Sequence, residues 1–126
     1  MEVVRQWFEA LNSEDFELAL ALVRPDIELV PPGGQAPHRG SEGLRRWMEP
    51  DAFQEQVVEP LEVVVASDTT ILGKQHVTAR GAASGIVLDV ISWSVWTFDE
   101  EGLIARVEIY LEHEEDTARA AAGMRE

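Results

Sequence analysis

A small set of polar side chains within apolar segments could form hydrogen bonds to a ligand. Ser92 and Ser94 alternate with large apolar residues in segment 86–98, and Gln75 lies in the apolar-rich segment before it. Small hydroxyl groups leave space and offer hydrogen bonds, which a tightly packed core avoids. Four tryptophans add the aromatic surface that many ligand cavities use. These features predict a pocket for a small apolar molecule, lined by Trp7, Trp47, Gln75, Val90, Ser92, Ser94, Trp96, Val107, Ile109 and Leu111, with His38 at its mouth.

Groups that could move a proton or bind a metal ion are scattered along the chain. His38, His76 and His113 lie in three different segments, without the i, i+4 spacing that places two imidazoles on one helix face. We therefore expect no metal site and no cofactor. Strand alternation places His76, Asp89 and Glu108 on faces that point away from the pocket. A slip of one residue in the strand register would turn them inward.

The composition limits the classes of partner and of chemistry. The chain has 126 residues, 45% of them hydrophobic, which suits one globular domain over residues 1–126. It carries 24 acidic and 10 basic side chains, and the net charge of −14 disfavours nucleic acid and anionic membranes as partners. The absence of cysteine excludes disulfides, thiolate metal sites and cysteine nucleophiles. The sequence shows neither a secretory signal nor a membrane-spanning run, so we expect a cytoplasmic protein.

Helices that would support the pocket are predicted in the first half of the chain. Apolar residues at spacings of three and four predict helices over 2–12 and 14–23, the second capped by Ser13. A short strand at 27–30 and a loop at 35–40 follow. Ser41 then caps a third helix that ends at Pro50.

The second half of the chain predicts a sheet. The hydrophobic period changes to two, which predicts four antiparallel strands at 57–66, 69–80, 86–98 and 103–112. A final helix spans 114–122, with an acidic first turn and a glycine after its end. The order α-α-β-α-β-β-β-β-α indicates an α+β fold, with helices gathered at one end of an antiparallel sheet.

Strand 86–98 is apolar on both faces, although an antiparallel strand with one solvated face alternates apolar and polar residues. Helices can cover one face, and the short loops cannot cover the other. Large exposed apolar patches are rare in monomers. This predicts a homodimer through the outer face of the sheet, centred on Ile91, Trp93 and Val95.

Several segments together resemble one known superfamily over nearly the whole chain. They are residues 3–12, Asp15-Phe16, Ala21-Leu22, Pro25-Asp26, Pro31-Pro32-Gly33-Gly34 leading to Arg39-Gly40, Ser94–Phe98, Gly102–Ile104 and Val107–Glu112. The pattern resembles the nuclear-transport-factor-2-like superfamily, in particular its branch of ketosteroid isomerases and SnoaL-like polyketide cyclases. The resemblance implies a cone-shaped, curved sheet wrapped by helices, a dimer, and an apolar pocket inside the cone.

The catalytic residues of these relatives are not found at the matching positions. The ketosteroid isomerase tyrosine falls on Trp7, its general-base aspartate on Pro31 and its protonated aspartic acid on Ser94. Indole offers only an N–H donor and proline offers no base. The acid/base aspartate of the cyclases falls at Ile109, and its assisting histidine at Ser94 or Val95. The Asp-Arg-Asp set of limonene epoxide hydrolases cannot be assembled either.

Three functions therefore stay open. The first is a SnoaL-like protein that binds a small, largely hydrophobic molecule, with no reaction assigned. The second is an isomerase or cyclase acting on a polyketide-like or terpenoid substrate through Asp89, His76 or Glu108. The third is a non-catalytic dimerisation module whose cavity is filled core.

Overall fold

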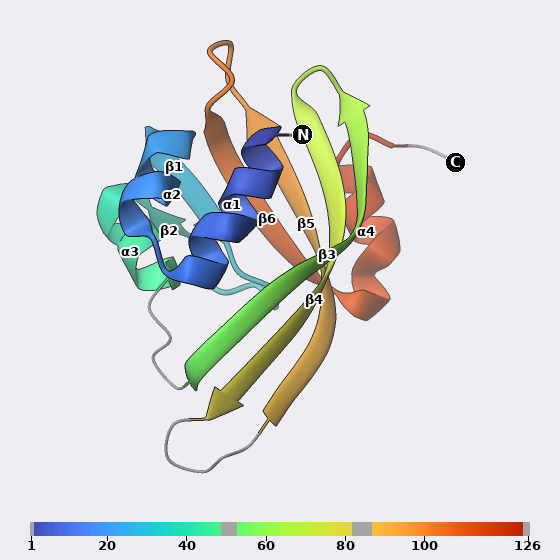
Figure 1. Cartoon of the computed structure of the whole chain (residues 1–126). Helices are drawn as coiled ribbons and strands as arrows, with labels where there is room; N and C mark the ends of the chain where they lie inside the picture. The colour runs from blue at the N-terminus through green and yellow to red at the C-terminus, as the bar shows by residue number, and fades with distance from the viewer. Residues whose placement is uncertain (1, 49–52, 82–86, 125–126) are drawn as a thin grey trace.

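The chain folds into a six-stranded sheet with helices on both faces (Figure 1). The computed structural model describes residues 2–48, 53–81 and 87–124. In chain order the elements are α1 (Glu2–Ser13), α2 (Phe16–Leu22), β1 (Val23–Val30), β2 (His38–Arg39), α3 (Gly40–Met48), β3 (Phe53–Ser67), β4 (Thr70–Gly81), β5 (Val87–Phe98), β6 (Ile104–Leu111), a 3-10 turn (Glu112–Glu114) and α4 (Glu115–Ala121). The predicted α+β class is confirmed.

The sheet order is β2-β1-β6-β5-β4-β3. Strands β3 to β6 form the predicted antiparallel meander, with Gln75 opposite Ser92 and Ser94 opposite Ile109. Strand β1 pairs with β6 in parallel, so the sheet is mixed, with one parallel pair beside the predicted antiparallel strands. The long strands β3, β4 and β5 extend past the others at one end of the sheet (Figure 1).

The helices near the N-terminus form as their apolar spacing predicts. In α1, Val4, Trp7 and Phe8 lie on one buried stripe. The cap of α2 is Asp15 rather than Ser13, because the Asp15 carboxylate accepts the Leu18 N–H at 3.1 Å. The Ser13 hydroxyl instead donates to a carbonyl of the preceding helical turn.

Two boundaries differ from the expectation around β1. This strand begins at Val23, immediately after α2, and it includes Pro25. The expected loop at 35–40 contains the two-residue strand β2, which pairs with β1 and which no period-two pattern could reveal. The helix end predicted at Pro50 and the turn predicted at 81–85 fall outside the described residues, apart from Gly81 at the end of β4.

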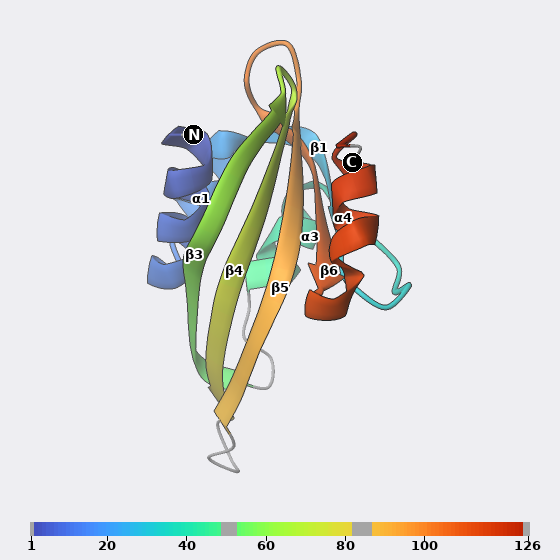
Figure 2. The ribbon, with the colours of Figure 1, turned by 90° about the vertical axis from the view of Figure 1, so that its right-hand side faces the viewer.

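Helices of the same chain pack on part of each face of the sheet (Figure 2). Helices α1, α2 and α3 pack on the face that contains Trp96 and Val107. On the opposite face, Ala118 and Ala122 at the C-terminal helix pack with Trp93 and Val95.

This packing gives a different account of the apolar outer face of β5. Trp93 and Val95, expected at the centre of a dimer interface, are 2% and 0% exposed beneath α4. Ile91 stays partly exposed on the same face. A homodimer through the uncovered part of this face remains a prediction.

None of the helices in the described part of the chain is long and apolar enough to cross a membrane.

Candidate functional site

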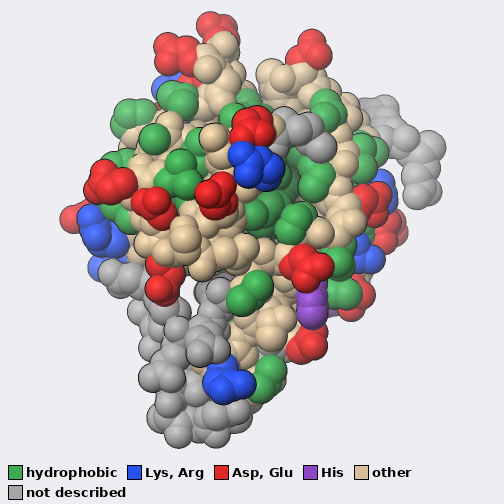
Figure 3. Space-filling view, viewed as in Figure 1, with side chains coloured by type: hydrophobic (Ala, Val, Ile, Leu, Met, Phe, Trp, Pro, Cys, Tyr) green, Lys and Arg blue, Asp and Glu red, His purple; other side chains and the backbone are tan. Residues whose placement is uncertain are grey.

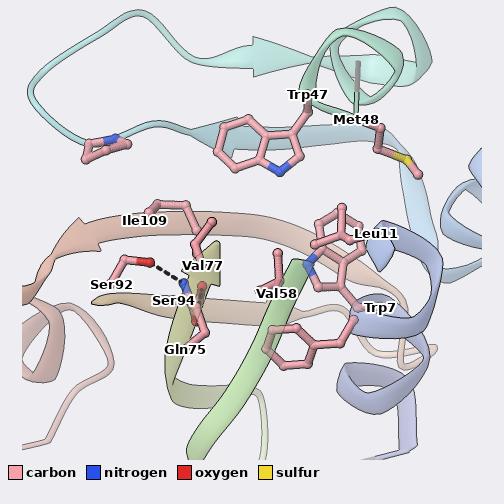
Figure 4. Close-up of a pocket in the computed structure, with 12 residues that line it drawn as sticks. Trp7, Leu11, Trp47, Met48, Val58, Gln75, Val77, Ser92, Ser94 and Ile109 are labelled. Carbon is pink, nitrogen blue, oxygen red and sulfur yellow. Dashed lines mark hydrogen bonds between the residues drawn. The ribbon is translucent and has the colours of Figure 1, made fainter. Parts of the chain in front are cut away.

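A cavity of about 290 Å³ lies between the sheet and helices α1 and α3. Trp47 and Met48 extend from α3 over the sheet, and Trp7 and Leu11 extend from α1 (Figure 4). The floor is formed by four adjacent strands, β3 to β6. The complete lining comprises Trp7, Phe8, Leu11, Pro32, Trp47, Met48, Val58, Gln75, Val77, Ser92, Ser94 and Ile109.

Three polar side chains form one hydrogen-bonded row on the floor of this cavity. The Gln75 amide Nε2 donates to Ser92 Oγ at 2.8 Å, and the Ser94 hydroxyl donates to Gln75 Oε1 at 2.9 Å. Gln75 and Ser94 are each 3% exposed. Because Gln75 is the cross-strand partner of Ser92, and Ser94 is two residues along β5, the sheet register fixes the row.

Indole groups face the row from the helix side of the cavity. The indole nitrogens of Trp7 and Trp47 are turned toward the space between the two side chains and the sheet (Figure 4). The His38 ring packs edge-on against Trp47, with ring centroids 5.9 Å apart. Gly43 lets α3 lie close to the His38 backbone, since a Cβ atom there would lie 2.8 Å from the His38 carbonyl carbon. His38 thus flanks the cavity through Trp47, outside the lining set.

The structure brings six of the ten expected lining residues to the cavity and leaves four outside it. The six are Trp7, Trp47, Gln75, Ser92, Ser94 and Ile109. Trp96 and Val107 are fully buried in the core beneath, where Phe8 packs against the Trp96 ring at 5.6 Å. Val90 and Leu111 occupy the correct sheet face but are 39% and 41% exposed beyond the cavity.

Half of the lining was absent from the sequence-based set. These residues are Phe8, Leu11, Pro32, Met48, Val58 and Val77. Phe8 and Leu11 belong to the apolar stripe of α1, so the helical period carried the signal for them. Pro32 lines the wall, whereas its neighbour Pro31, which matches the position of a family base, does not.

The three groups considered for acid–base chemistry all lie on the other face of the sheet. His76 pairs across the strands with the partly exposed Ile91, and its Nε2 contacts Asp89 Oδ1 at 2.5 Å. Glu108 is opposite Val95 on the outer face, and it accepts a hydrogen bond from Tyr110 at 2.6 Å. The register therefore turns none of the three side chains toward the cavity.

The pKa of Tyr110 is raised above its ordinary value by the surroundings of its hydroxyl group. Burial and the adjacent Glu108 carboxylate raise the pKa of Tyr110 to about 12. Glu108 in turn belongs to a charged row on the outer face, in which Arg106 bridges Glu108 and Glu28, and Glu28 also pairs with Arg39.

The cavity can hold a molecule by shape and hydrogen bonding. No carboxylate, imidazole, guanidinium or ammonium group is among the described residues that line it. Nor does the described part of the chain gather three or more His, Cys, Asp or Glu side chains that could hold a metal ion. The side-chain groups of the lining that can donate or accept a hydrogen bond are neutral hydroxyl, carboxamide and indole groups.

Comparisons with known proteins give a family and a fold. A family model described as a SnoaL-like domain matches residues 4–107. No curated protein is significantly similar in sequence to the chain.

Three solved structures illustrate the similarity. A putative polyketide cyclase from Sinorhizobium meliloti is 27% identical, with a TM-score of 0.70, and the match covers 86% of this chain and 94% of that one. A Mycobacterium tuberculosis protein in complex with estradiol-17beta-hemisuccinate is 18% identical, with a TM-score of 0.77, covering 87% and 91%. The epoxide hydrolase/cyclase-like enzyme SalBIII is 16% identical, with a TM-score of 0.79, covering 87% and 88%. The last two similarities concern the fold alone.

Proposed function

The chain belongs to the SnoaL-like family, and from this premise we propose that its cavity binds a small, neutral, largely apolar molecule. The observation that carries the proposal is the cavity of about 290 Å³, whose described lining is apolar apart from a neutral polar row and two indoles. Apolar walls with a few placed hydrogen-bonding groups are typical of small-molecule sites.

Charge supports a neutral ligand over an anionic one. The net charge is −14, and red acidic side chains outnumber blue basic ones on the face shown in Figure 3. A carboxylate ligand would approach a negative molecule and then enter a cavity whose described lining offers no cation.

The comparisons support the largely apolar character of the ligand, and they do not bear on its charge. The Mycobacterium tuberculosis protein was solved in complex with a steroid hemisuccinate, whose apolar skeleton carries one free carboxyl group, and the Sinorhizobium meliloti protein is named for polyketide chemistry. Both ligand classes are largely apolar.

Thermal unfolding with a panel of steroids, flat aromatic polyketides, terpenoids and fatty acids tests the proposal. A ligand at about a hundred times its dissociation constant stabilises the folded state by roughly 2.7 kcal/mol, which raises Tm by several degrees. We expect a shift for at least one neutral class and none for the fatty acids. If no neutral compound shifts Tm, the binding proposal fails and a filled core in a dimerisation module becomes the better account.

Intrinsic fluorescence then locates the binding site within the protein. Ligand binding is expected to change the emission of Trp7 and Trp47, which line the cavity. A Trp93→Phe variant is the matched control, because Trp93 lies beneath α4 on the opposite face. Its signal change should equal that of the natural chain, whereas Trp47→Phe should reduce the change.

A second candidate is a cyclase or isomerase that works by positioning and by polarising a carbonyl. The printed names of the relatives support it, and the Ser92 and Gln75 donors could hold a developing oxyanion. General acid–base catalysis has no titratable group among the described lining residues. Incubation with each compound that shifts Tm, followed by chromatography, separates binding from conversion.

A further inference from the structure

The Gln75 carboxamide uses only half of its hydrogen-bonding capacity within the described residues. A primary amide offers two N–H donors and two carbonyl lone pairs. One N–H donates to Ser92 and one lone pair accepts from Ser94. One N–H and one lone pair therefore remain, on a side chain that is 3% exposed and lines the cavity.

The positions of the two serines determine where the free groups point. Ser92 and Ser94 are two residues apart on β5, so their side chains stand roughly 7 Å apart on one sheet face. They flank the amide, with one serine beside its nitrogen and the other beside its oxygen. Figure 4 shows the Gln75 side chain directed from β4 toward the cavity, with its amide hydrogen-bonded to Ser92.

The end of the amide thus presents a donor next to an acceptor. Turning the amide over by 180° and reversing the serine hydroxyls leaves the same pair of free groups in exchanged positions. The site therefore keeps its complementarity in both orientations, and the serines prevent the amide from rotating out of the plane of the row.

We propose that Gln75, held by Ser92 and Ser94, recognises a cis-amide group of the ligand: a lactam, an imide or a primary carboxamide. This inference rests on the proposed binding function and names the polar group that the ligand carries. A cis-amide matches the free N–H and lone pair with its own carbonyl and N–H, forming two parallel hydrogen bonds. A ketone or an ester satisfies only the free N–H and leaves the second lone pair of the Gln75 carbonyl oxygen unused, so it forms one hydrogen bond where a cis-amide forms two.

A carboxylate presents two acceptors and is the wrong partner for the same reason. The lone pairs of the carboxylate would face the free lone pair of Gln75 Oε1 and repel it. The described lining contains no cation that could compensate for this repulsion. The group that fits best is therefore neutral at pH 7. The flat indole of Trp47 across the cavity adds a surface against which an aromatic lactam can pack (Figure 4).

Three probes of nearly equal size and shape test the inference by isothermal titration calorimetry on the full chain. They are 2-quinolone, which is a cis-lactam; N-methyl-2-quinolone, which has lost the N–H; and coumarin, in which a ring oxygen replaces it. We expect 2-quinolone to bind at least about tenfold more tightly than the other two, because each of these lacks the second hydrogen bond, to the free lone pair of Gln75 Oε1. Equal affinities for the three probes would overturn the inference and leave the binding proposal standing.

Substitution at Gln75 assigns the preference to its amide. Gln75→Met keeps the length of the side chain and removes both polar groups, so it should weaken 2-quinolone most and leave the three probes with affinities within about twofold of one another. Lys74→Met is the matched control, since Lys74 is the neighbouring residue on the opposite face, near Trp93, and its substitution should preserve the preference. A preference that survives in Gln75→Met would overturn the assignment.

The serines act through Gln75, so they are positioning residues. Their substitution should change the ratio of the affinities for 2-quinolone and coumarin. Ser94→Ala frees the amide oxygen and should reduce the ratio of 2-quinolone to coumarin affinity without abolishing it. If none of the three probes binds while another neutral compound shifts Tm, the cis-amide inference fails alone. If no neutral compound of any class shifts Tm, the binding proposal fails with it.

Discussion

The side chain of Asn12 and the backbone of Val58 exchange two hydrogen bonds. Asn12 Nδ2 donates to the Val58 carbonyl oxygen at 2.9 Å, and the Val58 N–H donates to Asn12 Oδ1 at 2.7 Å. Strand β3 is the edge of the sheet, so this carboxamide takes the place of a neighbouring strand. Because Val58 also lines the cavity, the pair fixes the end of α1 against the cavity floor.

Asn12→Ala removes both of these hydrogen bonds and leaves two backbone groups of the edge strand without a partner. We expect a loss of about 1–3 kcal/mol in the free energy of unfolding, measured by urea denaturation. Ser13→Ala is the control, because its exposed hydroxyl bonds only to a carbonyl of its own helix. Equal stability of the two variants would show that the Asn12 contact does not hold the edge.

The ring of Trp96 packs directly against the backbone of Gly73 on the neighbouring strand. A Cβ atom at Gly73 would lie 2.6 Å from Cζ3 of Trp96. Gly73→Ala should therefore destabilise the fold by about 1–3 kcal/mol, since the buried ring has no room to move. In combination with Trp96→Phe, which shortens the ring system, the added cost of the alanine should shrink, and a double-mutant cycle measures this coupling. Additive effects would contradict the steric account.

Tyr110 is the single tyrosine of the chain, so an ultraviolet titration reports its ionisation alone. Burial and Glu108 raise its pKa to about 12, and Glu108→Gln should lower this value while leaving it above 10, because burial is the larger cause. The folded state then holds a proton that the unfolded state has lost between about pH 10 and 12. Stability from this group is complete below about pH 10 and falls as the pH rises through 12. A tyrosine that titrates near 10 in the folded protein would refute the assignment.

We still expect a homodimer through the outer face of the sheet, with a smaller interface than the sequence suggested. Trp93 and Val95 are covered by α4, which leaves the partly exposed Ile91 and the exposed Val57 and Val87 as apolar contacts. Light scattering at micromolar concentration should give twice the 14.0 kDa chain mass. Ile91→Lys is expected to weaken the association, because it places a charge on this surface. A monomeric mass would rule out the dimer.

The sequence predicted the elements far better than the residues that surround the cavity. Period-two alternation located β3 to β6, and the alternation on β4 placed Gln75 inward and His76 outward, as the register has it. The parallel pairing of β1 with β6 could not be predicted, because it depends on a contact between segments about 80 residues apart.

The errors in the predicted cavity lining arise because strand alternation does not tell how deeply a side chain is buried on its face of the sheet. Trp96 shares a face with Ser94, yet it lies in the core because Phe8 packs over it and Gly73 gives it room. Val90 and Leu111 share the same face and lie beyond the cover of the helices. Alternation assigns a side chain to a face, and only the packing of α1 and α3 decides which part of that face is cavity.

The cover on the outer face was missed for a related reason. Helix α4 contacts Trp93 and Val95 through alanines, and a stripe of small residues such as Ala118 and Ala122 gives little hydrophobic signal. From the sequence alone, the apolar outer face of β5 therefore indicates a second subunit, although α4 covers part of it through these alanines.

The neutral lining of the cavity has a thermodynamic consequence. Because no ionisable group is among the described lining residues, binding of a neutral ligand should neither take up nor release protons. The calorimetric enthalpy should then be the same in phosphate and Tris buffers, whose heats of ionisation differ widely, and the affinity should stay constant between about pH 7 and 9. With no ionisable group among the lining residues that the structure describes, a binding profile measured against pH should report the pKa of the ligand.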